Sequence, residues 1–207
     1  MKDHIKFILQ NSIIFAGISF GFSIIGGLFP SSEHTFVIGN PLEVSGITVE
    51  HVVGHIFWGA IIGLGTLSVR YIILGGSFAI LLDADHLLQF LDIELVSRMS
   101  HSVVLAIIVA IVFFIVLRGK DLRIAAVAFG AVLSHIAFDM FIAEMIFYNS
   151  GGSTAKFPLF SPFQLDSIIL QGSDWIFFEV AGVIIVIVMS YISKKREIMV
   201  KDSPTKT

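Results

Sequence analysis

The 207-residue chain contains no cysteine and few charged residues. Without cysteine it has neither disulfides nor thiolate ligands, so any metal ion must be held by nitrogen and oxygen atoms. Only 14% of its residues are charged, against roughly 25% in a soluble domain. The net charge is −3 and no basic face stands out, so no nucleic-acid partner is expected.

Hydrophobic residues, by contrast, make up 56% of the chain, and 20 of its residues are phenylalanine. Long apolar runs of this kind predict an all-α integral membrane protein, with residues 1–207 forming a single transmembrane domain. We expect a bundle of about six transmembrane helices, at 5–29, 52–69, 71–91, 99–117, 122–147 and 175–193. Residues 30–50 and 148–174 are the two long loops of this arrangement.

The distribution of lysine and arginine predicts the orientation of the bundle. One set of alternate loops, together with both termini, carries 11 of the 13 basic residues, and the other set carries only Arg98 and Lys156. Because positively charged loops stay in the cytoplasm, both termini are expected to be cytoplasmic. The predicted location is the plasma or inner membrane, with a multi-pass topology.

Seven ionisable side chains that can bind metal lie within these apolar segments. Such groups are costly in hydrocarbon, so they usually face the protein interior and carry function. At about 1.5 Å per helical residue, they fall about 18–25 Å from the predicted cytoplasmic boundary on four successive helices. This common depth predicts one shared site in the outer half of the membrane, facing the non-cytoplasmic side and formed by His55, Asp83, Asp85, His86, His101, His135 and Asp139.

The spacing of these residues determines which of them can act together. His135 and Asp139 are four residues apart, so both side chains leave the same face of one helix, and His51 and His55 have the same spacing. Asp83 is only two residues from Asp85, a spacing that points side chains apart on a regular helix. We therefore expect a helix end or a distortion at that point.

Three or four such ligands suffice for one catalytic zinc ion, so the set is large enough for more than one. We expect one to three divalent ions, zinc first and manganese second. Two ions about 3.5–4 Å apart are typical of phosphoester hydrolysis. A structural interpretation, in which a single His or Asp bonds between helices, remains open for each residue, particularly for His51 at the membrane interface. His51 and Arg98 are the candidate catalytic residues; Arg98 could clamp a phosphate or anchor its helix at the interface.

Five short motifs follow one another along the chain: Gly54-His55, Leu82-Asp83-Ala84-Asp85-His86, Ser100-His101-Ser102, Ser134-His135 with Asp139, and Pro158-Leu159-Phe160-Ser161-Pro162. In this order they resemble the membrane-bound metal-dependent hydrolase family of LexA-regulated, YdjM-like inner-membrane proteins. The resemblance covers about residues 50–163 and leaves the first and last helices outside it. Two departures stand out: Leu82 replaces a proline, and Arg98 is one position closer to the histidine than in the family pattern.

The resemblance implies hydrolysis without supplying a substrate. Together with the membrane setting it favours a lipid or lipid-linked phosphoester as substrate, cleaved by metal-activated water. The loop 157–163 is apolar but broken by prolines, so it could guide acyl chains or simply connect two packed segments. Two alternatives stay open: a metal-dependent lipid amidase of the ceramidase type, and a divalent-metal transporter without enzymatic activity.

Overall fold

The computed structural model describes residues 2–26, 48–84, 100–148, 155–157, 159–160, 163, 168–170 and 173–202. Within these ranges the chain forms six helices and one small antiparallel sheet. The helices are α1 (Lys2–Gly26), α2 (Val49–Leu64), α3 (Val69–Leu81), α4 (Val103–Val116), α5 (Leu122–Tyr148) and α6 (Asp174–Asp202). The strands β1 (Ala155–Phe157) and β2 (Ile168–Leu170) pair between α5 and α6 along the sequence.

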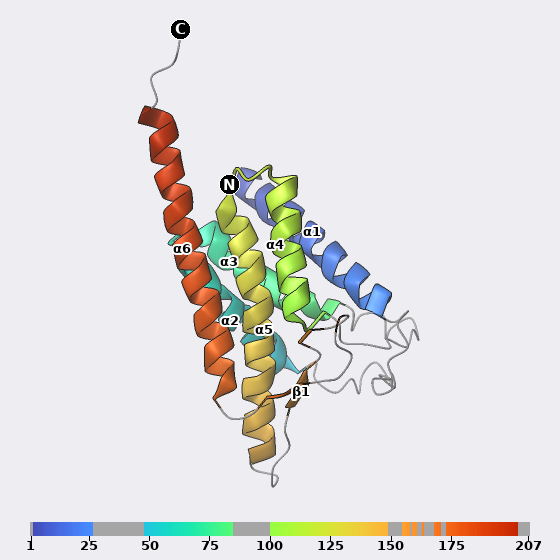
Figure 1. The fold of residues 1–207 in the computed structure, drawn as a ribbon. Helices are drawn as coiled ribbons and strands as arrows, with labels where there is room; N and C mark the ends of the chain where they lie inside the picture. Colours follow the sequence, from blue (N-terminus) through green and yellow to red (C-terminus); the bar gives the residue numbers. More distant parts are fainter. Residues whose placement is uncertain are drawn as a thin grey trace.

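Helix α5 is the centre of the bundle, and α2, α3, α4 and α6 all pack against it (Figure 1). In its most apolar stretch 89% of the residues are buried, whereas the corresponding values for α1 and α6 are 22% and 28%. The outer helices therefore expose apolar faces, which a lipid environment would cover.

Three of the described helices, α1, α5 and α6, are long and apolar enough to cross a membrane. Helices α2 and α4 are apolar but shorter, and α3 has 13 residues, or about 20 Å of length. The membrane-protein class is thus supported by length and composition, and the six-span topology stays a prediction.

Several helix boundaries differ from those expected from hydropathy, for identifiable physical reasons. Helix α4 begins at Val103, because the Ser102 hydroxyl accepts a hydrogen bond from the Leu105 backbone N–H and caps the helix. Helix α3 ends at Leu81, and residues 82–84 form a 3₁₀ turn, so the expected distortion is present. Helix α6 continues to residue 202, because lysine, arginine and glutamate are good helix formers although they end an apolar run. The strands β1 and β2 were not expected in a chain predicted to be all-α.

Helices α2 and α3 approach each other through glycines. A Cβ atom at Gly59 would overlap the backbone oxygen of Gly75, and one at Gly75 would overlap the backbone oxygen of Gly59. One at Gly76 would lie 2.8 Å from the backbone oxygen of Ile56. Small residues are what lets two helix backbones pack this closely in membranes, and the contact brings the start of α2 beside the end of α3.

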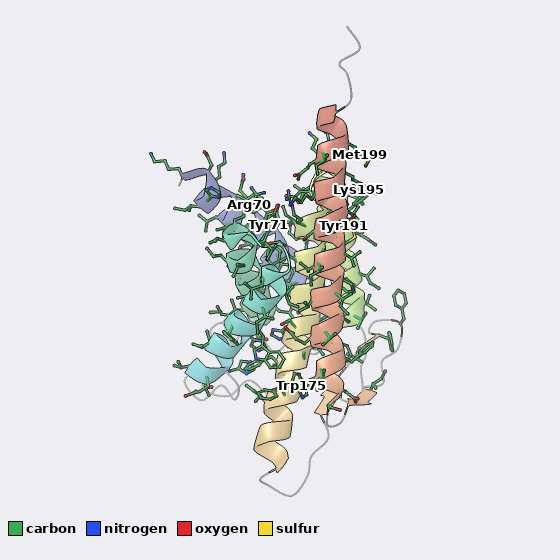
Figure 2. The ribbon with its side chains drawn as sticks, turned by 90° about the vertical axis from the view of Figure 1, so that its left-hand side faces the viewer. Arg70, Tyr71, Trp175, Tyr191, Lys195 and Met199 are labelled. Atoms are coloured by element: carbon green, nitrogen blue, oxygen red, sulfur yellow. The ribbon has the colours of Figure 1, made fainter. Side chains whose placement is uncertain are left out.

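A polar cluster joins four helices at the opposite end of α3, where Figure 2 labels Arg70 and Tyr71. The hydroxyl of Tyr71 donates to Asp121 and accepts from Arg70. The Arg123 guanidinium donates hydrogen bonds to Asp121 at 3.0 Å and to Glu197 of α6 at 2.8 Å. The Arg70 guanidinium also lies 4.8 Å from the centre of the Phe7 ring of α1, so this cluster ties α1, α3, α5 and α6 together.

Candidate metal centre

Six of the nine predicted site residues lie in described ranges, and the structure brings all six together. They come from α2, the turn after α3, the residues before α4, and α5. Their ligand atoms form overlapping groups within 4.8 Å of one another, so the cluster could hold a metal ion. The six residues are His51, His55, Asp83, His101, His135 and Asp139.

Four ligand atoms form what we call the α2 set, namely His51 Nε2, His55 Nε2, Asp83 Oδ2 and Asp139 Oδ1. The Nε2 atoms of His51 and His55 lie 2.9 Å apart. From His51 Nε2 the distances are 3.5 Å to Asp83 Oδ2 and 3.8 Å to Asp139 Oδ1. From His55 Nε2 the same two oxygens lie at 3.5 and 3.2 Å.

A second group, the α4–α5 set, uses the other oxygen of each aspartate. The Nε2 atoms of His101 and His135 are 3.0 Å apart. His101 Nε2 lies 3.4 Å from both Asp83 Oδ1 and Asp139 Oδ2, and for His135 Nε2 the two distances are 3.3 and 3.5 Å. Both carboxylates therefore face two pairs of histidines at once.

Hydrogen bonds outside the cluster orient the histidines of the α4–α5 set. His135 Nδ1 donates to the Ala79 carbonyl at 2.8 Å, which leaves the Nε2 lone pair facing the aspartates. His101 Nδ1 bonds to the Ser100 hydroxyl at 3.0 Å. Metal-binding histidines characteristically use their second nitrogen in this way.

A helix cap at the start of α2 places the other two histidines. The Thr48 hydroxyl caps the helix by accepting from the His51 backbone N–H at 3.2 Å. The carboxylate of Glu50 accepts hydrogen bonds from its own backbone N–H and from the Thr48 hydroxyl, which lowers its pKa. His51 and His55 then lie one turn apart on the same face, as their spacing predicts.

The ligands of the cluster differ in exposure. His55 and His135 are 0% exposed and His101 is 1% exposed, whereas the side chains of Asp139, Asp83 and His51 retain 8%, 10% and 19% of their accessible surface. His51 is therefore the most exposed of the six described ligands.

An aromatic group borders the cluster on the α5 and α6 side. The ring of Phe138 lies over Gly54, where any Cβ would overlap it, and 4.8 Å from the ring of His55. Trp58 lies 5.5 Å from the Phe138 ring and 5.2 Å from that of Trp175, which stands at the start of α6 (Figure 2). Gly54 thus leaves the space that the Phe138 ring occupies, and a larger residue would displace that ring.

Three predicted site residues, Asp85, His86 and Arg98, lie outside the described residues, so their roles stay predictions. In the loop 157–163 the structure shows two different environments. Leu159 is buried, and its backbone oxygen accepts from the Val103 N–H at 2.9 Å, whereas Phe163 is 86% exposed.

Sequence reasoning missed the residues that support the histidines. The Ala79 carbonyl is a backbone group and leaves no trace in residue type, so no pattern could have revealed it. The spacing of Gly59 and Gly63 with the pair Gly75-Gly76 was a readable signal for a close helix contact.

No family model, curated protein or solved structure matches this chain in the three comparisons with known proteins.

Proposed function

We propose that the chain is a membrane-embedded, metal-dependent hydrolase that binds two divalent ions. His51 and His55 would hold one ion, and His101 and His135 would hold the other. Asp83 and Asp139 would each give one carboxylate oxygen to each ion. The observation that carries the proposal is the sharing of both carboxylates between two pairs of histidines. In this arrangement His51 is a metal ligand, whereas the sequence had suggested a catalytic role.

The interatomic distances favour metal ions over protons. An ion pair between a protonated histidine and a carboxylate closes to about 2.7–2.9 Å, yet the eight N–O distances in the two sets are 3.2–3.8 Å. Zinc in a tetrahedron at about 2.0–2.1 Å from its ligands places neighbouring ligand atoms about 3.3–3.4 Å apart. The eight N–O distances bracket that value, whereas the two Nε2–Nε2 distances of 2.9 and 3.0 Å are shorter. The mixed nitrogen–oxygen donors suit zinc or manganese.

Two such ions would activate water and stabilise the charge that develops on phosphoester oxygens. The protein's own contribution is to fix the ligands: the two aspartates bridge the sets, and the bonds to Ala79 and Ser100 hold two imidazoles in place. The burial of His55, His101 and His135 keeps bulk water away from the ligands, which strengthens electrostatic interactions with a substrate.

A lipid or lipid-linked phosphoester is the substrate class that the surroundings favour. His51 lies 5.9 Å from the Phe138 ring of the aromatic group, whereas the exposed apolar residues Val53 (57%) and Phe57 (62%) stand on the opposite face of α2. Trp58 and Trp175 belong to the same aromatic group, and tryptophan is enriched where a protein meets the membrane interface. A substrate with an apolar tail could therefore approach the ligands from the bilayer, on the predicted non-cytoplasmic side.

The transporter alternative is disfavoured by the packing beyond the cluster. Phe78 of α3 stacks on Phe15 at 4.4 Å and on Phe113 at 5.5 Å between ring centres, and all three rings are fully buried. This stack lies between the cluster and the polar end of α3 at Arg70. A cation would have to pass an apolar plug to cross the bundle.

The test is an activity panel on the purified, metal-loaded protein in lipid nanodiscs. We expect release of phosphorylated products from phospholipids, lipid phosphates or prenyl diphosphates, and loss of that activity in Asp139→Ala. Asp3→Ala is the matched control, because it makes the same substitution at an exposed carboxylate at the start of α1 and should leave turnover unchanged.

Three outcomes would overturn the proposal. Fatty-acid release from lipid amides alone would favour the amidase. Metal flux in proteoliposomes would favour the transporter. If the protein binds two ions but hydrolyses neither the phosphoesters nor the lipid amides, the metal centre stands and the hydrolase assignment is wrong.

A further inference from the structure

An apolar groove runs along the bundle far from the metal centre, between α4 and α6, with α5 as its floor. Its volume is about 440 Å³, within the range of sites that hold small molecules. None of the metal-site residues lines it. The principal lining residues are Ala110, Phe114, Ala126, Phe129, Ile185 and Arg196.

The dimensions of the groove match one hydrocarbon chain. From Ile185 to Arg196 it follows 12 residues of α6, which is a rise of about 16 Å. Half of a bilayer's hydrocarbon core is about 15 Å thick. The groove therefore spans about one leaflet, and it lies toward the end of the bundle that holds both termini (Figure 1).

A single cation, Arg196, stands at the end of this otherwise apolar lining. The neighbouring Glu197 is engaged by Arg123 at 2.8 Å. Arg196 forms no ion pair within the part of the chain that the structure describes. Its guanidinium is thus available to bind an anion at the mouth of the groove.

We propose that the groove binds one acyl chain of an anionic phospholipid, whose phosphate pairs with Arg196. A partner helix, about 10 Å across, fits poorly in a space of this volume, whereas a lipid supplies both the apolar chain and the negative charge. The site lies in the leaflet opposite to that of the metal centre, so it does not depend on the hydrolase proposal.

The test uses phosphatidylglycerol with a photoactivatable acyl chain, and phosphatidylcholine with the same chain, added to the full-length protein in detergent. Peptide mapping should place the phosphatidylglycerol cross-links on α4, α5 and α6 at the groove. Arg196→Gln should weaken phosphatidylglycerol binding about five-fold, as expected for one cation at a membrane surface. Ala110→Phe should abolish labelling by filling the groove.

Two matched controls accompany these variants. Lys195→Gln removes an equal charge from the neighbouring exposed position, outside the lining (Figure 2). Val116→Phe adds a ring at an exposed position of α4, on a different side of the helix from the lining residues Ala110, Ile111 and Phe114. The proposal is overturned if both lipids label equally, if Lys195→Gln weakens binding as much as Arg196→Gln, or if Ala110→Phe retains the cross-links.

Discussion

The close contact between α2 and α3 should be essential for metal binding, and Gly59→Ala tests this. A Cβ atom at position 59 would lie 2.9 Å from the carbonyl carbon of Gly75 and closer still to its oxygen. Since non-bonded carbons settle at about 3.5 Å, the helices must separate by at least roughly 0.6 Å. Backbone atoms cannot rotate away, so we expect an overpacking cost of about 1–3 kcal/mol.

The same displacement reaches the ligands, because His55 is one helical turn from Gly59 and Asp83 follows the end of α3. Metal–ligand distances tolerate deviations of about 0.2 Å. The shift should therefore weaken metal affinity by about 10–100-fold, as the loss of a supporting contact does.

Competition with a zinc chelator would measure the affinity, and thermal unfolding in detergent with and without metal would measure the stability. Gly17→Ala is the control, because a Cβ there meets nothing within 4 Å. Wild-type zinc affinity in Gly59→Ala would refute the claim that this glycine contact positions the ligands.

Four further substitutions separate the parts of the account. Asp139→Ala should lose both ions and His101→Ala only one, by about 100–1,000-fold per ligand removed; metal counting by mass spectrometry would show it, and equal losses would contradict the bridging role. Gly54→Ala should displace the Phe138 ring and lower zinc affinity with little change in helix content, measured by chelator competition and circular dichroism; an unchanged affinity would count against it. Tyr71→Phe should lower stability by about 1–2 kcal/mol without changing metal content, and a loss of metal would show that the polar end of α3 is coupled to the site.

The elements of the fold were readable from hydropathy because each apolar run corresponds to a helix. Helix ends were less readable, since hydropathy measures affinity for lipid and not the hydrogen bonds that stop a helix. The Ser102 cap starts α4 four residues after the predicted beginning of that span, and the charged end of α6 continues the helix beyond its apolar run. The strands β1 and β2 each have three residues, too few for an alternating pattern to register.

The candidate site could be predicted further than the fold, because ionisable residues are conspicuous in an apolar chain. The equal depth predicted for the ligands on four helices correctly indicated that His55, Asp83, His101 and His135 lie close together. The division of the ligands into two sets could not be predicted, since it depends on which oxygen of each aspartate faces which histidine pair. His51 was assigned a different role because a position near a helix start does not reveal where its ring turns.

The number of divalent ions bound per chain is the most direct test of the central claim. Purified protein, reconstituted with zinc or manganese and freed of excess metal, would be measured by inductively coupled plasma mass spectrometry beside a His55→Ala/His135→Ala variant. We expect two ions per chain in the natural sequence and fewer than one in the variant. No bound metal, or equal metal in both proteins, would contradict the account.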